Sequence, residues 1–198
     1  MLTCRKDMGV NTTADLKGKT LGVWFYGNEY PFLSWMSRLG LKTDGSANGV
    51  TVLRQGWGVE PLTEGQAACV STMSYNEYWV VRDAGYSPEQ LTVFKYQSEG
   101  AATLEDGLYV HEKNLSDAAF KDKMVRFVRA SMKGWKYAEA NPKEAAMIIL
   151  DNDDAGVQTE KHQVRMMGEI AKLTAGSNGS LDPADYERTV KVLMSGDS

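Results

Sequence analysis

The sequence has little cysteine and little histidine, and these scarcities exclude several classes of protein. Its two cysteines, Cys4 and Cys69, do not make a disulfide framework, and neither has metal-binding partners at ligand spacing. Because Cys69 lies within an apolar run, we expect it to be a small core residue, and Cys4, near the terminus, to be exposed. We predict neither a metal site nor a cofactor.

Long apolar runs and blocks of like charge are also missing. The longest apolar runs, such as residues 145–150, are far too short to span a bilayer, so no membrane insertion is expected. The net charge is −4 with Lys and Arg scattered, which argues against a nucleic-acid partner. Residues 1–7 lack the apolar core and cleavage site of a secretory signal, so we expect no export signal in this chain.

Catalytic motifs are absent from the sequence. His111 and His162 are the only histidines, so a Ser-His-Asp hydrolase would have to use one of them. No Gly-x-Ser-x-Gly elbow, Walker loop or His-Glu-x-x-His motif occurs. His162 lies on a polar helix face and is expected to be solvated, whereas His111 could lie near a cleft. No catalytic residue is predicted.

The most informative stretch runs from residue 15 to residue 30. A basic, glycine-containing turn leads into the apolar run Leu21–Tyr26, which breaks at Gly27, and Asn28 can cap a helix that begins near Glu29. The first turn of such a helix has unpaired N–H groups and the positive end of its dipole, which suit an anionic or polar small ligand. This order of strand, turn and helix predicts a small-molecule cleft.

The first half of the chain alternates between expected strands and expected helices. Strands separated by single helices indicate an α/β fold with a mostly parallel sheet. The expected strands are Leu21–Tyr26, Val50–Arg54, Cys69–Met73 and Leu91–Tyr96, and the expected helices are Glu29–Leu39, Val59–Gln66 and Asn76–Ala84.

The character of the sequence changes near Glu105, which predicts an α/β lobe over residues 1–104 and a helical portion over 105–198. After one expected strand, Leu108–His111, only helices follow. We expect Ser116 to cap a long helix that ends at Asn141-Pro142, followed by helices at 143–150, 159–174 and 183–194. One stripe of the long helix is expected to pack in a core: Phe120, Met124, Phe127, Ser131, Trp135 and Ala138.

Two Asn-Glu-Tyr triplets, at 28–30 and 76–78, both follow expected strands. The carboxyl ends of parallel strands fall at one edge of a sheet, so the two triplets should converge on one crevice. Trp57, between two glycines, is a better candidate for stacking on a flat ligand than Trp24, for which core packing is the simpler interpretation. Ordinary helix capping also accounts for the two asparagines. The predicted ligand-binding residues are Tyr26, Gly27, Asn28, Glu29, Trp57, Tyr75, Asn76 and Glu77.

Four segments, at 15–23, 27–32, 74–78 and 127–135, carry a family resemblance. Together they resemble the type II periplasmic substrate-binding proteins, in the branch that delivers thiamine-pyrimidine precursors to ABC importers and is related to fungal thiamine-pyrimidine synthases. The resemblance implies a periplasmic-binding-protein-like II fold, a small-molecule ligand, an importer permease as partner and a periplasmic location.

The same resemblance implies that residues 1–104 form lobe two, that 105–198 return to lobe one, and that the N-terminal part of lobe one is lacking. The strand at 108–111 would then have an unpaired edge, which predicts a homo-oligomer. Two alternatives stay open. One is an enzyme, either related to the synthases, which use a pyridoxal cofactor and a cysteine-rich block not found here, or a weak promiscuous esterase or phosphoesterase. The other is a dimerising fragment that binds no ligand.

Overall fold

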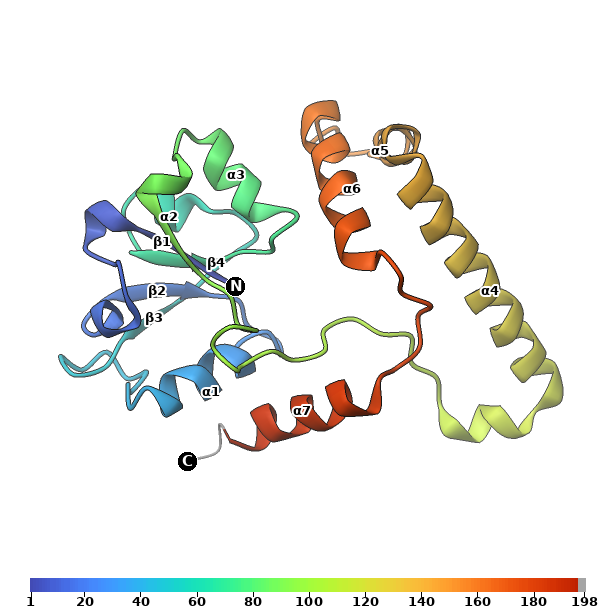
Figure 1. The fold of residues 1–198 in the computed structure, drawn as a ribbon, viewed down its shortest axis with the longest axis horizontal. Helices are drawn as coiled ribbons and strands as arrows, with labels where there is room; N and C mark the ends of the chain where they lie inside the picture. The colour runs from blue at the N-terminus through green and yellow to red at the C-terminus, as the bar shows by residue number, and fades with distance from the viewer. Residues whose placement is uncertain (196–198) are drawn as a thin grey trace. The chain divides into compact units, whose positions relative to one another are not determined.

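The computed structural model describes residues 1–195 and divides into two compact units (Figure 1). The sheet unit comprises Met1–Leu104 and the segment that begins at Asp182, and the helical unit comprises Glu105–Leu181. Residues 182–195, which the sequence interpretation groups with the helical portion, therefore belong to the sheet unit. No helix in residues 1–195 combines the length and hydropathy needed to cross a bilayer.

A five-stranded sheet with the order β3-β2-β4-β1-β5 forms the centre of the sheet unit. Its strands are β1 (Leu2–Arg5), β2 (Thr20–Val23), β3 (Thr51–Arg54), β4 (Cys69–Ser71) and β5 (Leu91–Phe94). β2 runs parallel to β3 and β4, whereas β1 is antiparallel to both β4 and β5. Only β1 therefore runs against the other four strands, and the predicted α/β class with a mostly parallel sheet is confirmed.

β1, which lies between β4 and β5, is a strand that the sequence did not predict. Its four residues alternate between apolar Leu2 and Cys4 and polar Thr3 and Arg5, but four residues at the start of the chain are too few to predict a strand by themselves. A segment this short becomes a strand because its neighbours on both sides pair with it. That tertiary pairing carries no local signal in the sequence.

Helices cover both faces of the sheet (Figure 1). α1 (Tyr30–Arg38) lies on one face, and α2 (Glu60–Thr63) and α3 (Glu77–Asp83) lie on the other. α7 (Pro183–Met194) begins as predicted with Asp182 as its cap and Pro183 in its first turn, and it packs beside α1. The hydroxyls of Ser34 and Ser195 are 2.8 Å apart at that contact.

Adjacent residues of the central strands supply the two cores. Cys69 belongs to the cluster that packs against α1, while Val70 belongs to the cluster under α2 and α3, because successive strand residues point to opposite faces. The larger cluster contains Leu21, Val23, Phe32, Trp35 and Met36, all nearly or fully buried. Both faces of the sheet are therefore packed.

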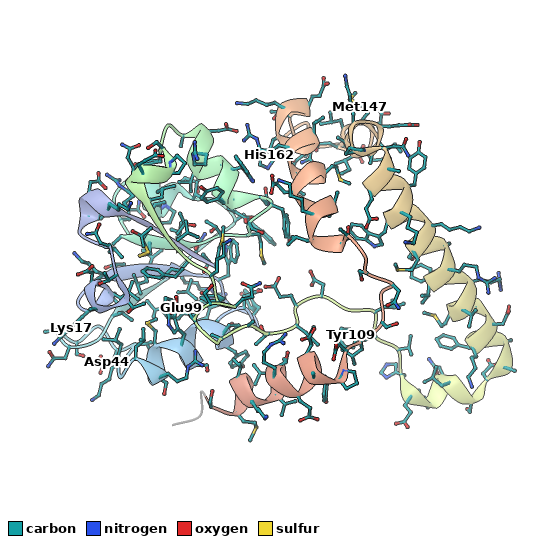
Figure 2. All side chains as sticks on the ribbon, in the orientation of Figure 1. Lys17, Asp44, Glu99, Tyr109, Met147 and His162 are labelled. Carbon is teal, nitrogen blue, oxygen red and sulfur yellow. A yellow bond between two sulfur atoms is a disulfide. The ribbon has the colours of Figure 1, made fainter. Side chains whose placement is uncertain are left out.

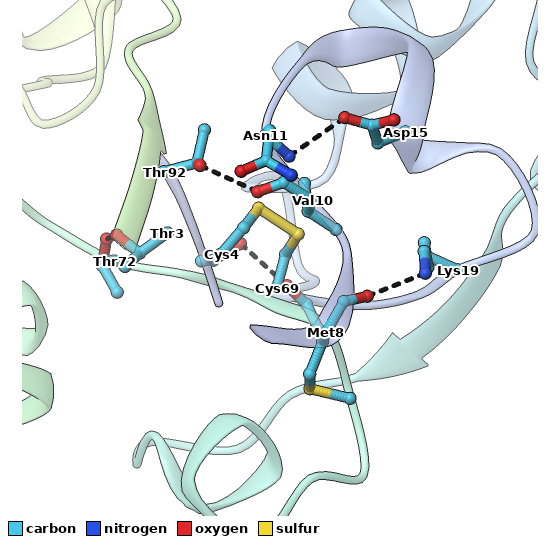
Figure 3. The surroundings of a disulfide bond; sticks show 12 residues. Thr3, Cys4, Met8, Val10, Asn11, Asp15, Lys19, Cys69, Thr72 and Thr92 are labelled. Atoms are coloured by element: carbon cyan, nitrogen blue, oxygen red, sulfur yellow. Dashed lines mark hydrogen bonds between the residues drawn. A yellow bond between two sulfur atoms is a disulfide. The ribbon is translucent and has the colours of Figure 1, made fainter. Parts of the chain in front are cut away.

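A disulfide joins Cys4 to Cys69 across β1 and β4 (Figure 3). The two residues are register partners in the antiparallel pair, and both are fully buried. The prediction that Cys69 lies in the core is confirmed, but the predictions of an exposed Cys4 and of no disulfide are wrong. The pair was missed because only the pairing of β1 with β4 brings together residues that are 65 positions apart.

Polar contacts fix the segments around the disulfide (Figure 3). The hydroxyls of Thr3 and Thr72 are 2.7 Å apart, and Lys19 Nζ donates to the carbonyl of Met8 at 2.8 Å. The Thr92 hydroxyl donates to the carbonyl of Val10 at 2.8 Å. These bonds satisfy polar groups that pairing of the strands would otherwise leave without partners.

The helical unit consists of α4 (Ala118–Ala140), α5 (Pro142–Asp151) and α6 (Glu160–Thr174), preceded by a 3-10 helix at Glu112–Ser116. Asp117 caps α4 by accepting a hydrogen bond from the backbone N–H of Ala119 at 2.9 Å, so the predicted cap at Ser116 is one residue too early. The helix ends before Pro142, as predicted.

Two predictions for this unit are wrong. Residues 108–111 are not a strand: Tyr109 lies on an extended segment and is 82% exposed (Figure 2), so the strand edge on which the homo-oligomer prediction rested does not form. The stripe of α4 does not form a core either. No α4 residue is buried, and Phe127 and Trp135 are 54% and 46% exposed. The small core of this unit consists of Ala145, Ala146 and Met167 on α5 and α6.

Candidate functional site

Three segments that follow parallel strands surround a cavity of about 550 Å³ in the sheet unit. They come directly after β2, β3 and β4, so all three begin at the same edge of the sheet. The lining residues are Trp24, Phe25, Tyr26, Asn28, Arg54, Gln55, Gly56, Trp57, Met73, Tyr75, Asn76 and Glu77. A volume of this size suits a small molecule.

The segment after β2 is a strained turn. Tyr26 has a φ of +66°, in the left-handed region that a residue other than glycine seldom occupies, and Gly27 follows with a φ of +109°. The Gly27 N–H donates to Glu29 Oε2 at 2.7 Å, which closes the turn. Tyr26 is 89% exposed although it lines the cavity. Such strain persists where the surroundings enforce it, often at functional sites.

The asparagine of this turn does not cap the helix. Asn28 Nδ2 donates back to the carbonyl of Phe25 at 3.2 Å, and α1 begins at Tyr30 with Glu29 in the capping position. The predicted cap at Asn28 is therefore wrong. The asparagine instead stabilises the turn, because its amide takes up a carbonyl that the irregular backbone leaves without a partner.

Buried Gln55 joins the segment after β3 to the last residue of β4. Its amide nitrogen donates to the carbonyls of Ser71 and Gly58, at 3.0 and 3.1 Å, and its oxygen accepts from the Ser71 N–H at 2.8 Å. Trp24 Nε1 donates to the carbonyl of Gly56 at 2.9 Å, which links this segment to the first one. Trp57 follows in the same segment and is 97% exposed.

The segment after β4 is closed by a carboxylate. Glu77 accepts a hydrogen bond from the Met73 N–H at 2.8 Å on one oxygen and from Asn76 Nδ2 at 2.7 Å on the other. Asn76 occupies the position before α3, but its side chain does not cap the helix. Glu77 therefore orders the turn that carries Tyr75 and Asn76 to the cavity.

Six of the eight predicted site residues line this one cavity: Tyr26, Asn28, Trp57, Tyr75, Asn76 and Glu77. Asn28 and Asn76 thus face the same space, although they come from separate strand-to-helix connections. Gly27 and Glu29 are not among the lining residues; their mutual hydrogen bond shapes the turn. The sequence predicts no binding role for the other six lining residues, which include Trp24, interpreted there as core, and Arg54.

Arg54 is the one positively charged residue that lines the cavity. Its guanidinium donates to the hydroxyl of Tyr26 and lies 4.7 Å from the centre of the Tyr26 ring and 5.6 Å from that of Phe25. Such contacts are favourable because the face of an aromatic ring is electron-rich. The signal that could have found Arg54 was available, since it ends the predicted strand Val50–Arg54 and so lies at the carboxyl edge of the sheet.

The chemistry of the lining suits binding of a flat polar molecule. Aromatic rings, amides and one ion of each sign surround the space, and no histidine is among the lining residues. His111 and His162 both belong to the helical unit. Across residues 1–195, no group of three or more His, Cys, Asp or Glu side chains is arranged to hold a metal ion.

Comparison with known proteins identifies the family. The model of the family described as NMT1/THI5 like matches residues 1–145, which includes all three segments of the cavity. No curated protein matches the chain. The mixed α/β fold agrees with a periplasmic-binding-protein-like domain. The chain therefore belongs to the NMT1/THI5-like family, within the thiamine-pyrimidine precursor-binding branch of the type II periplasmic binding proteins.

Proposed function

We propose that the chain binds a pyrimidine-precursor-like or other polar heteroaromatic molecule in the cavity at the carboxyl edge of the sheet. The observation that supports this proposal is the convergence of three strand-end segments on one space of about 550 Å³. Open α/β sheets bind ligands at this edge, where the loops can vary without disturbing the sheet. The family suggests a substrate-binding role of the same kind.

Aromatic contacts are the first part of the proposed binding mode. Tyr26 and Trp57 line the cavity and are almost fully exposed, at 89% and 97%, so their rings are available to a ligand. The apolar surface of these two rings is removed from contact with water only when a flat molecule covers it. This burial favours stacking of a flat ligand on the rings. In the proposal the two rings contact the heteroaromatic ring of the ligand.

Hydrogen bonds are the second part. The amide of Asn28 uses its nitrogen on the carbonyl of Phe25, which leaves its oxygen to accept from a ligand. Each carboxylate oxygen of Glu77 accepts one hydrogen bond from its own turn and has further capacity. In the proposal Asn28, Asn76, Tyr75 and Glu77 bond the polar edge of the ligand, and Gly27 and Glu29 act through the shape of the turn.

The importer permease and the periplasmic location remain predictions from the family resemblance. We propose that the loaded protein delivers its ligand to an ABC importer. Stimulation of importer ATPase activity in proteoliposomes by the loaded protein, and not by the empty one, would support this. A homo-oligomer also remains a prediction, without the strand at 108–111 as its basis, and light scattering measures it.

Isothermal titration with 4-amino-5-hydroxymethyl-2-methylpyrimidine tests the binding proposal. We expect the parent to bind this neutral probe and Trp57→Ala to weaken binding about tenfold, because a stacked ring is lost. Trp135→Ala is the matched control, since Trp135 is also exposed but belongs to the helical unit. Absence of binding to this pyrimidine, to its derivatives and to riboflavin precursors would refute the proposal.

A further inference from the structure

Arg54 lines the proposed ligand site, and its guanidinium contacts two aromatic side chains. It is the last residue of β3, and its guanidinium lies over the rings of Tyr26 and Phe25 while it donates to the Tyr26 hydroxyl. A long side chain on an exposed strand end is normally mobile, and ordering it costs rotamer entropy. The contacts with the two rings offset part of this cost and favour a guanidinium beside the cavity that Arg54 lines.

The charge of Arg54 has no carboxylate partner among the described residues. Ion pairs found there join other basic residues to carboxylates, among them Arg5, Arg126, Lys172 and Arg188. A guanidinium has five N–H donors, and within residues 1–195 the one hydrogen bond found for the Arg54 side chain goes to the hydroxyl of Tyr26. Several donors therefore remain for a ligand, in a planar arrangement that matches a carboxylate or phosphate.

The acidic residue of the same cavity is not that partner. Glu77 binds the Met73 N–H and the amide of Asn76 with its two oxygens, so it serves its own turn. Arg54 is the only basic residue of the lining, and Glu77 the only acidic one. The cavity thus offers a positive group with several open donors and a negative group whose two oxygens each already accept one hydrogen bond.

We infer that the molecule bound in this cavity carries an anionic group, a carboxylate or a phosphate, which Arg54 binds beside the aromatic platform. The inference rests on the proposed function and adds the charge of the ligand to it. Arg54 is then a specificity-determining residue: it selects the anionic member among flat heteroaromatic molecules of similar shape. The arginine is exposed, so solvent screens the attraction and the preference is moderate.

A purely structural role for Arg54 makes a different prediction. If the guanidinium only supported the ring of Tyr26, its removal would change the affinity for every ligand by a similar factor. If it binds an anionic group, its removal changes the ratio between charged and neutral ligands. The informative quantity is therefore the ratio of two dissociation constants, which a general loss of affinity does not alter.

The test uses an isosteric pair, 4-amino-2-methylpyrimidine-5-carboxylate and its 5-carboxamide, titrated into the full chain. We expect the parent to bind the carboxylate about tenfold more tightly, as a charge-assisted hydrogen bond in a solvated site provides. In Arg54→Gln the ratio should fall to about one, with the carboxamide affinity changed by less than about threefold. Arg54→Lys keeps the charge but loses the planar donors, so its ratio should lie between these values.

Lys95→Gln is the control for net charge. Lys95 follows β5, at the opposite edge of the sheet from β3, and does not line the cavity, so this variant should keep the tenfold ratio.

A ratio near one in the parent, or an unchanged ratio in Arg54→Gln, would overturn the inference and leave the proposed function standing. Failure of both probes to bind the parent would also overturn the inference, whereas the titration with 4-amino-5-hydroxymethyl-2-methylpyrimidine decides the proposed function separately. Should Arg54→Gln not fold, the ratio in Arg54→Lys decides, and no reduction there also counts against the inference.

Discussion

The sheet unit and the helical unit bury their apolar side chains to very different extents. In the sheet unit two clusters cover both faces of a five-stranded sheet, and large side chains such as Phe32 and Trp35 are almost completely buried. In the helical unit the core contains two alanines and one methionine, and α4 buries none of its 23 residues. Apolar side chains thus form a packed core in the sheet unit and exposed helix faces in the helical unit.

This difference explains where a binding site can be built. A site needs side chains held within a fraction of an ångström, and rigid elements provide that precision better than loosely packed ones. The cavity lies at the edge of the packed sheet, and its loops are tied together by the buried amide of Gln55 and by the Trp24–Gly56 hydrogen bond. In the helical unit, exposed apolar side chains gather on α4 and α5, at Val125, Phe127, Val128, Trp135, Ile148 and Ile149.

The largest expected contrast comes from truncating one phenylalanine in each unit. Phe32→Ala should lower the free energy of unfolding of the sheet unit by about 4 kcal/mol, because a fully buried ring is replaced by a cavity. Phe127→Ala, at a site 54% exposed on α4, should change stability by less than about 0.5 kcal/mol. Urea unfolding with segment-resolved hydrogen exchange measures both effects separately.

Phe32→Leu controls for loss of the ring alone and should cost less than about 1.5 kcal/mol, since most of the volume is kept. A large loss for Phe127→Ala would contradict the comparison, because it would mean that the ring is buried in solution.

Removal of the disulfide should have the next largest effect and should act on the sheet unit. The bond closes a loop between residues 65 positions apart, so the double change Cys4→Ser and Cys69→Ser should lower the free energy of unfolding by about 3 kcal/mol. Urea unfolding with and without reductant measures it. Reductant should destabilise the parent and leave the serine variant unchanged. Equal behaviour of the parent in both conditions would show that the two thiols are not joined.

Much of the fold could be predicted because local signals agree with tertiary structure. Turn residues and apolar runs predict the start of α7 at Pro183, the end of α4 before Pro142 and the strands β2 to β5. Local signals fail where a segment depends on distant partners. β1 is a strand only because β4 and β5 pair with it, and residues 108–111, although apolar, lack such neighbours among residues 1–195.

The candidate site was predictable to a similar degree and for a related reason. The rule that parallel strands end at one edge predicts that Asn28 and Asn76 lie close to one cavity. The same rule applied to the end of β3 would have included Arg54 and Gln55. The sequence did not predict that the strand expected over 21–26 ends at Val23, nor that Tyr26 adopts a positive φ in the turn that follows. Because β2 ends at Val23, Trp24, Phe25 and Tyr26 are outside the strand, and all three line the cavity instead of alternating between faces.

A smaller effect is expected from Gln55, which connects the site to the packed sheet. Gln55→Ala should lower the free energy of unfolding by about 2 kcal/mol, because it leaves the N–H and carbonyl of Ser71 without partners in a buried place. Hydrogen exchange at the Ser71 amide should speed up. Gln66→Ala is the matched control: Gln66 is exposed and bonds only Glu64, so stability should stay within about 0.5 kcal/mol of the parent. Equal losses in the two variants would argue against a special role for Gln55.

The smallest expected effect depends on pH and is confined to the sheet unit. Asp15 accepts hydrogen bonds from the backbone N–H groups of Thr12 and Asn11 and from the Thr12 hydroxyl, and these bonds lower the pKa of Asp15 below its ordinary value. A folded-state pKa below the unfolded one means that the carboxylate stabilises the fold above its unfolded pKa, and that this contribution disappears as the pH falls through the folded pKa. Asp15→Asn should therefore be less stable than the parent at neutral pH, and the two unfolding curves should converge in acid.

Asp154→Asn, an equal loss of charge at an exposed site of the helical unit, provides the reference. A stability difference for Asp15→Asn that persists unchanged at low pH would mean that the amide disturbs the turn by its shape, since only the charge of the carboxylate is titrated away in acid.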